Sequence, residues 1–127
     1  MVTSKQIEEL FGVLGERVRL RLACCLLAAP QGLTVGELVG AVGAPQPNVS
    51  HHLKLMKAAG LVEARREGRF IRYALVRVAH PFFESLRCCV QACCCEPDIA
   101  EDLKKLRSAA SPRGKKTSGG RARRITR

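Results

Sequence analysis

The sequence has no long hydrophobic run: nowhere do 18 or more apolar residues follow one another, so we expect no transmembrane helix. Its first residues, MVTSKQIEEL, lack the basic-then-apolar order of a secretory signal peptide. These absences predict a cytoplasmic protein with no membrane partner. At 127 residues the chain is long enough for one domain with a modest core, and dimerisation would add buried surface.

Signatures of catalysis are also missing. The sequence contains no glycine-rich phosphate loop, no carboxylate pair spaced for acid–base work and no Cys–His–Asn or Cys–His–Asp set with a plausible pocket. We therefore expect a protein that is not an enzyme. A thiol-rich protein that sequesters metal is the alternative from another class, and salt-dependent binding to a specific DNA sequence would exclude it.

Acidic residues are scarce relative to basic ones, because 22 Lys and Arg against 11 Asp and Glu give a formal net charge of +11. Residues 111–127 contain seven basic residues and no acid, and their Gly- and Ser-rich composition predicts a disordered basic tail. The rest of the chain, with 15 basic and 11 acidic residues, still carries +4. A basic domain favours a polyanionic partner.

Several segments have apolar residues three and four positions apart, which predicts amphipathic helices. The capping box of Thr34 and Glu37 marks one helix start. Within 61–76 the period changes to that of two strands around a glycine turn. The expected elements are helices over 4–14, 16–29, 34–42 and 47–59, the hairpin, a helix from about 79 into a run of cysteines, and a short helix over 98–110. The expected organisation is one domain over 1–97, the short helix over 98–110, and the tail over 111–127.

Two helices joined by a tight turn and followed by a basic hairpin have the order of a winged helix-turn-helix. The expected fold class is therefore mainly α, with about five or six helices and a two-stranded wing. In this fold the second helix of the pair lies in the major groove of DNA, where exposed residues near its start reach base edges. The predicted DNA-binding residues are Gln46, Asn48, Ser50, His51 and Lys54 on that helix, and Arg65, Arg66, Arg69 and Arg72 on the hairpin.

The segment APQPNVSHHLKLMKAAGLVEARREGRFIRYAL resembles the ArsR/SmtB family of metal-sensing repressors, whose recognition helix and wing are similar to its two halves. The upstream VLGERVRLRLACCLL is similar to the second helix of that family, with Arg19 at a commonly basic position. The resemblance covers about residues 5–95. It implies a homodimer, built from the first and last helices, that binds operator DNA and releases it when an effector binds.

The start of the recognition helix departs from the family pattern. Pro45 stands where the family usually has Ser or Thr, so it offers no side-chain cap. Pro47 disfavours helical angles at Gln46, which predicts a shifted helix start. His51 is expected to face DNA, and His52 to pack or bond within the protein.

Seven cysteines in a chain expected in the cytosol do not indicate disulfides, because that compartment keeps thiols reduced. Five of them lie within eight residues, and such clustering points to metal, metalloid or redox chemistry. The third helix lacks the family's usual cysteine motif, since residues 37–40 read Glu-Leu-Val-Gly. The predicted site is therefore the cysteine cluster, which we define as Cys88, Cys89, Cys93, Cys94 and Cys95.

Soft thiolates select soft ions, and three of them in a pyramid suit trivalent arsenic or antimony, As(III) or Sb(III). Arsenic-responsive members of the resembling family have a similar adjacent pair followed by a later cysteine. The favoured ligands are Cys88, Cys89 and Cys95, with Cys93 or Cys94 as substitutes. Methylated trivalent arsenic would need only two of them.

Other effectors stay open at this point. Cadmium, lead, mercury and copper are also soft metals that thiolates bind. A repressor that senses persulfides is a further alternative, with Cys24 paired to Cys88 or Cys89. Against this pairing, Cys24 and Cys25 lie in the middle of a predicted buried helix and are expected to belong to the core.

Overall fold

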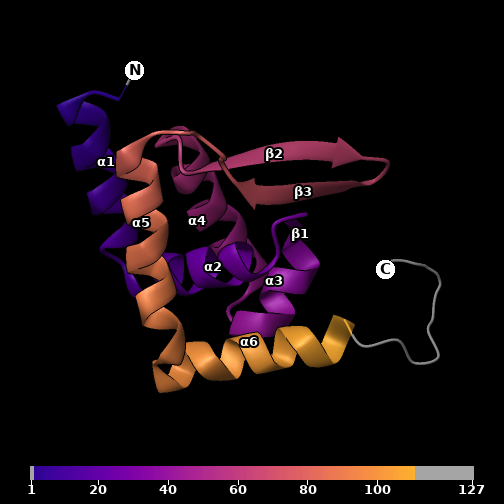
Figure 1. Ribbon diagram of the computed structural model, residues 1–127. Helices are drawn as coiled ribbons and strands as arrows, with labels where there is room; N and C mark the ends of the chain where they lie inside the picture. Colours follow the sequence, from indigo (N-terminus) through magenta and orange to yellow (C-terminus); the bar gives the residue numbers. More distant parts are fainter. Residues whose placement is uncertain (1, 111–127) are drawn as a thin grey trace.

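The computed structural model describes residues 2–110; residue 1 and residues 111–127, where the predicted basic tail falls, lie outside the described part. The described residues form six α-helices, one 3-10 turn and a three-stranded sheet (Figure 1). This is the predicted winged helix-turn-helix. The elements are α1 (Ser4–Leu14), α2 (Arg17–Ala28), β1 (Leu33–Thr34), α3 (Val35–Val42), α4 (Gln46–Ala58), β2 (Val62–Glu67), β3 (Phe70–Leu75), α5 (Pro81–Ala92), η1 (Cys93–Cys95) and α6 (Pro97–Ala110).

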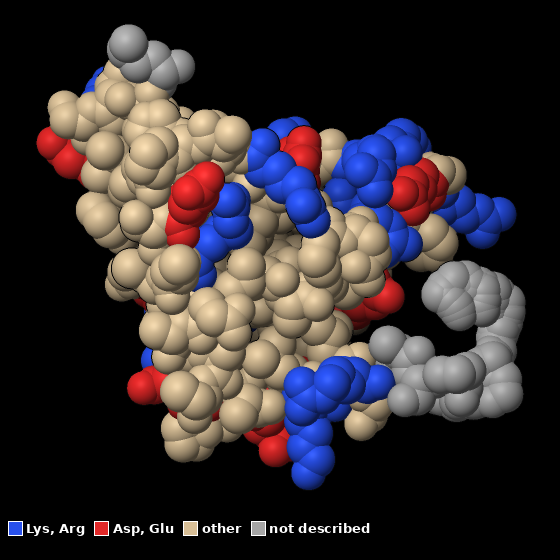
Figure 2. All heavy atoms as spheres, viewed as in Figure 1, with Lys and Arg blue, Asp and Glu red and all other residues tan. Residues whose placement is uncertain are grey.

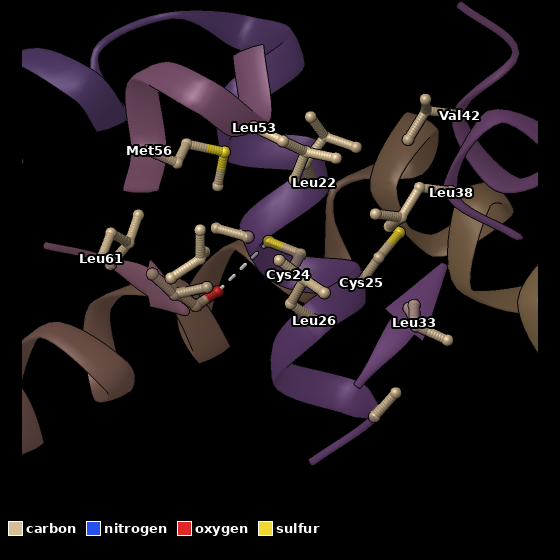
Figure 3. Close-up of a cluster of buried hydrophobic side chains, with 14 of the residues drawn as sticks. Leu22, Cys24, Cys25, Leu26, Leu33, Leu38, Val42, Leu53, Met56 and Leu61 are labelled. Atoms are coloured by element: carbon tan, nitrogen blue, oxygen red, sulfur yellow. Dashed lines mark hydrogen bonds between the residues drawn. The ribbon is translucent and has the colours of Figure 1, made fainter. Parts of the chain in front are cut away.

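The core is built around the middle of α2, which the other helices surround (Figure 3). The five consecutive residues from Leu22 to Leu26 are all buried. They include Cys24 and Cys25, both fully buried, so their predicted place in the core is confirmed. Burial of one large apolar side chain is worth roughly 1.5–3 kcal/mol, and α2 therefore fixes where its neighbours pack.

The wing is the antiparallel pair β2 and β3, which projects from the helices (Figure 1). Its register runs from Val62 opposite Leu75 to Glu67 opposite Phe70, and Gly68 turns the chain with a φ of 62°. The short strand β1 adds to the free edge of β3. The sequence did not indicate β1, because two residues are too few to display a strand period.

The helix-turn-helix consists of α3 and α4. The predicted capping box is present: the Thr34 hydroxyl accepts from the Glu37 backbone N–H at 3.2 Å, and the Glu37 carboxylate accepts from the Thr34 N–H at 2.8 Å. Gly43 ends α3 in the left-handed region, with a φ of 76°. This conformation favours glycine and starts the turn into α4.

The shift in the start of α4 that the sequence predicted is wrong. The helix begins at Gln46, so Pro47 occupies its first turn, where a missing N–H leaves no helical bond unmade. As predicted, Pro45 makes no side-chain cap. Its carbonyl oxygen instead accepts backbone hydrogen bonds from Asn48 at 3.0 Å and Val49 at 3.1 Å.

The last part of the chain forms a corner at the cysteines. The predicted helix does not run through the whole cluster, because α5 ends at Ala92 and the next three cysteines form η1. His80 caps the start of α5, where its Nδ1 accepts from the Phe82 N–H at 3.0 Å. The predicted short helix is α6, which packs on α2 and α3 through the fully buried Ile99. None of the helices between residues 2 and 110 is both long and apolar enough to cross a bilayer.

Leu53→Ala tests how firmly α4 is held by the core. Leu53 is fully buried, so the smaller side chain leaves a cavity, and we expect the free energy of unfolding to fall by about 2–5 kcal/mol in urea titration. Leu55 lies on the same helix but is exposed, and Leu55→Ala is the matched control, with an expected change below about 0.5 kcal/mol. Equal losses in the two variants would contradict the packing described here.

Candidate DNA-binding surface and cysteine cluster

The outer face of α4 is polar, while Val49, Leu53 and Met56 bury its inner face. The predicted contact residues all lie outward: four are exposed and Ser50 is half-buried. Within residues 2–110 none of these five side chains forms a hydrogen bond or an ion pair. Their donors and acceptors are therefore available to a ligand. The five are Gln46, Asn48, Ser50, His51 and Lys54.

His52 faces the protein, as predicted for a structural histidine. Arg19 of α2 donates from Nη1 to its Nδ1 at 3.2 Å. The same guanidinium donates from Nε to the Val13 carbonyl oxygen at 2.6 Å. Arg19 thereby ties α4 to the end of α1, and this contact positions the recognition helix.

The four predicted arginines of the wing differ in their contacts. Arg65 and Arg72 both bind the carboxylate of Glu67, at 3.3 and 2.9 Å, and Arg72 holds the pKa of that carboxyl below its usual value. Arg66 and Arg69 are exposed and form no ion pair or hydrogen bond within the described residues. The uncompensated positive charge of the wing therefore lies on Arg66 and Arg69.

Arg72 is further occupied at the base of the wing. It donates from Nη1 to the Gly32 carbonyl oxygen at 3.0 Å and lies 3.8 Å from Glu37. Gly32 has a φ of 97°, and a Cβ atom there would stand 2.7 Å from Cγ of Arg72. The close approach requires glycine, and it fixes Arg72 as a residue that joins the wing to the helices.

Phe70 was missed by the reasoning from sequence. It is 64% exposed beside the turn of the wing, although it is one of the largest apolar residues of the chain. The exposure of Phe70 could have been predicted from the sequence, because strand alternation places Phe70 on the same face as the charged Arg72. An exposed aromatic residue among arginines is suited to contact with the sugars and bases of a groove.

Lys and Arg gather over the wing and at the far end of α6 in the face shown in Figure 2. The basic residues of α6 at that end include the exposed Lys104 and Lys105. Acidic side chains on this face are more scattered (Figure 2). On this face, the basic side chains are thus most densely grouped over the wing and the far end of α6 (Figure 2).

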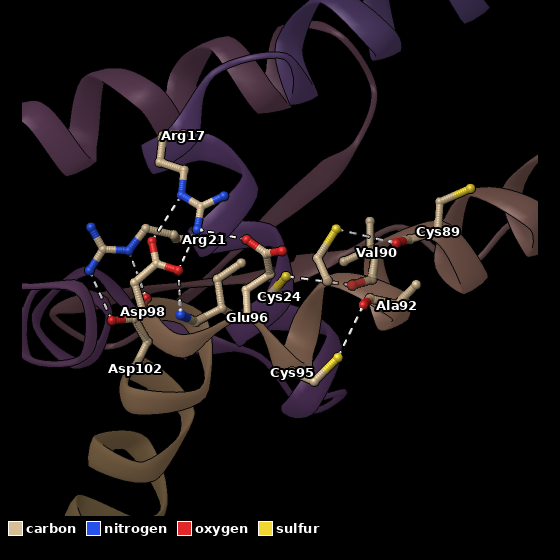
Figure 4. A network of polar contacts seen from close by, with 12 residues as sticks. Arg17, Arg21, Cys24, Cys89, Val90, Ala92, Cys95, Glu96, Asp98 and Asp102 are labelled. Atoms are coloured by element: carbon tan, nitrogen blue, oxygen red, sulfur yellow. Dashed lines mark hydrogen bonds and ion pairs between the residues drawn. The ribbon is translucent and has the colours of Figure 1, made fainter.

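The cysteine cluster is spread over α5 and η1. Cys88, Cys89 and Cys95 are exposed, and the other two are half-buried. Cys93 donates to the Cys89 carbonyl oxygen at 3.5 Å and Cys95 to that of Ala92 at 3.6 Å (Figure 4). Among residues 2–110 no three His, Cys, Asp or Glu side chains are grouped closely enough to hold a metal ion. The predicted three-thiolate set is therefore not preassembled in this conformation.

Cys24 meets the cluster from the core. Its sulfur and that of Cys94 donate to one carbonyl oxygen, that of Val90, at 3.6 and 3.7 Å. Burial raises the pKa of Cys24, and the adjacent Cys94 raises it further. Burial likewise raises the pKa of Cys25 to about 12. The cluster member beside Cys24 is thus Cys94, whereas the sequence suggested Cys88 or Cys89.

Residues 18–64, from α2 into β2, match the family described as bacterial regulatory protein, arsR family. The crystal structure of the transcriptional repressor BigR from Xylella fastidiosa is similar, with a TM-score of 0.59 and 30% identity over 72% of this chain and 85% of BigR. The chain belongs to the ArsR family. The matched residues contain the helix-turn-helix but none of the cysteine cluster, so ArsR membership concerns the DNA-reading part of the chain.

Two other ArsR-type relatives bear names that state a role. The transcriptional repressor SmtB of Mycobacterium tuberculosis is 42% identical over 72 residues, 53% of each chain. The arsenical resistance operon repressor of Escherichia coli is 34% identical over 67 residues, 53% of this chain and 56% of the repressor. The chain thus spans about half the length of these relatives, and its family is one of transcription regulators.

The two groups of cysteines should differ in reactivity. When the folded chain is treated with a thiol-alkylating reagent, we expect Cys88, Cys89 and Cys95 to be labelled first, because they are exposed. Burial raises the pKa of Cys25 to about 12, so this thiol should stay protonated between about pH 7 and 9, and raising the pH over that range should not speed its labelling. Peptide mass spectrometry at increasing times measures the order. Labelling of Cys25 as fast as Cys95, in a chain still folded by circular dichroism, would contradict the assignment.

Proposed function

We propose that this ArsR-family chain is a repressor that binds operator DNA as a homodimer and releases it when As(III) or Sb(III) binds thiolates of the cysteine cluster. The observation that carries the DNA-binding part is the outward face of α4, whose five predicted contact side chains form no hydrogen bond or ion pair within residues 2–110. Such a face next to a basic wing is suited to the major groove.

The chemistry of the exposed residues divides their roles on DNA. Asn48 and Gln46 each offer an amide that can bond adenine in two places, so they are the proposed base readers. Lys54 lies further along α4 and is proposed to contact phosphate, which positions the helix without reading sequence. Arg66 and Arg69 are the proposed wing contacts, since Arg65 and Arg72 share Glu67.

The homodimer is proposed to form through α1 and α5, which lie side by side (Figure 1). Phe11 of α1 is 59% exposed, although its ring stacks edge-on against Phe82 of α5 at 6.0 Å. Exposed aromatic surface of this kind is enriched at protein interfaces. A second copy covering Phe11 would also place the end of α5, with its cysteines, near the dimer interface.

The proposed effector site uses Cys88, Cys89 and Cys95, whose soft sulfurs suit trivalent arsenic or antimony. The name of the Escherichia coli relative supports this class of effector. Because the three thiols are not grouped, η1 must rearrange to bring them together. The ligand then favours the rearranged state, and DNA affinity falls by the same coupling factor. Tenfold release requires only about 1.4 kcal/mol of differential binding.

A second candidate effector is a persulfide, and the shared Val90 carbonyl favours it by holding Cys24 and Cys94 together. An organic persulfide would take two electrons from these two thiols. The products are one disulfide, one thiol and one molecule of hydrogen sulfide, which balances atoms and charge. Cys94 would react first because it is the more exposed of the pair.

Substitution in the wing tests the DNA-binding proposal. We expect Arg66→Ala and Arg69→Ala each to weaken operator binding several-fold and to reduce the salt slope by about 1, because each removes one phosphate contact. Arg65→Ala is the matched control, since Arg65 already has Glu67 as an ion-pair partner. Fluorescence anisotropy with an operator fragment over a range of salt concentrations measures both quantities. An equal loss in all three variants would rule out the division of roles.

Release assays distinguish the two effectors. We expect arsenite to release the wild type and the Cys24→Ser variant from operator DNA but not the Cys88→Ser/Cys89→Ser double variant. With a persulfide donor, Cys24→Ser and Cys94→Ser should resist release, and the wild type should show a Cys24–Cys94 disulfide by mass spectrometry. Release of the double variant by arsenite at the wild-type concentration would refute the proposed arsenic site.

A further inference from the structure

The helix α6 lies along the helix-turn-helix rather than apart from it. In Figure 1 it runs beneath α2 and α3, and it contacts both. Ile99 is fully buried there, and Leu103 and Leu106 pack against the same core. The apolar side of α6 therefore fastens the end of the described chain to the first helix of the DNA-reading unit.

This packed side also contains a carboxylate, Asp102, which is only 1% exposed. Its two oxygens accept hydrogen bonds from Arg21 of α2, from Nε at 2.8 Å and from Nη2 at 2.9 Å. The same Nη2 donates to the Val42 carbonyl oxygen at 2.8 Å. A two-point bond fixes the plane of a guanidinium, so Asp102 holds Arg21 in the orientation that reaches Val42.

Val42 lies at the end of α3, directly before the turn of the helix-turn-helix. It is the last residue of α3, so its carbonyl has no partner further along that helix. Directly after it the chain turns at Gly43 and enters α4, whose start has no side-chain cap. The bond from Arg21 is therefore a side-chain restraint on the turn that places the recognition helix.

The other end of α6 adjoins the cysteines. Pro97 begins the helix two residues after Cys95, and Arg17 of α2 binds Glu96 and Asp98 across this junction (Figure 4). A helix moves nearly as a rigid unit, and Asp102 lies only about 7 Å along the axis from Pro97. The helix α6 therefore connects η1 rigidly to Asp102.

We propose that Asp102 and Arg21 are positioning residues that transmit the state of the cysteine cluster to the helix-turn-helix. Rearrangement of η1 shifts the start of α6, and Asp102 then draws Arg21 away from Val42. The turn before α4 loosens, and affinity for operator DNA falls. The inference rests on the proposed function, since it takes thiol chemistry at η1 as the trigger.

The test compares Asp102→Asn with Glu101→Gln in the full chain. Both variants replace one carboxylate of α6 by an amide, but Glu101 is exposed and makes no hydrogen bond or ion pair within residues 2–110.

Three quantities are measured: arsenite affinity from thiolate absorbance, operator affinity with and without arsenite, and amide hydrogen exchange over residues 43–48. Asp102→Asn should bind arsenite like the wild type. The ratio of its operator affinity without arsenite to that with arsenite should nevertheless fall towards 1. Exchange in the turn should be at least several-fold faster in Asp102→Asn before arsenite is added, and Glu101→Gln should match the wild type throughout.

A double variant provides a second test in case Asp102→Asn does not fold. Arg21→Met with Asp102→Leu replaces the buried pair by apolar side chains, an exchange that folded proteins usually tolerate, and it also removes the bond to Val42. We expect the ratio of operator affinities without and with arsenite to fall towards 1 in this variant as well. A wild-type ratio in either folded variant overturns the inference.

The exchange measurement separates this inference from the proposed effector. If arsenite fails to release the wild type, the proposed arsenic response is wrong. The restraint itself is still tested, because it predicts faster exchange over residues 43–48 in Asp102→Asn than in Glu101→Gln without any effector. Equal exchange in the two variants would overturn it.

Discussion

Burial of the middle of α2 is the constraint on which the rest of this structure depends. Its five consecutive buried residues leave no solvent-facing side in the middle of the helix, so other elements must cover it all round. The two smallest of these positions after Ala23 are Cys24 and Cys25, and their small side chains let α5 and α6 approach closely. The same helix bears Arg17 and Arg21, which bind Asp98 and Asp102 of α6. One helix thereby connects the recognition helix, the cysteines and the C-terminal helix.

Which charged side chains form ion pairs matters more in this protein than how many charges it has. The wing has four arginines, yet Arg65 and Arg72 form ion pairs with Glu67 and Glu37, whereas Arg66 and Arg69 have no acidic partner within residues 2–110. On α6 the buried Asp102 is paired with Arg21 and orients it. A buried pair of this kind adds little net stability over an apolar pair, but its two-point bond specifies the orientation of the Arg21 guanidinium. That specificity matters here because the geometry lies next to the turn into α4.

The cysteines form two groups with opposite properties. Those of α2 are buried, and burial raises the pKa of Cys24 and Cys25, which makes them poor thiolates. Within the cluster, Cys93, Cys94 and Cys95 bond only weakly to carbonyl oxygens three or four residues before them. Such local bonds break readily, and η1 is short enough to change shape without unfolding α5 or α6. The contact between Cys24 and Cys94 joins the two groups.

The sequence by itself determined what depends on near neighbours: the helix periods, the capping box of Thr34 and Glu37, the hairpin around Gly68, and the outward face of α4. The sequence misplaced the start of α4. Proline disfavours helical angles at the residue before it, here Gln46, but Pro47 itself fits well in a first helical turn, and this second effect is the stronger one here. Only the tertiary structure decided that Arg72 belongs to the base of the wing, that Cys24 lies beside Cys94, and that Asp102 reaches Val42 through Arg21. These contacts join residues 21 to 81 positions apart, and no local pattern encodes such pairings, because they follow from how the helices pack around α2.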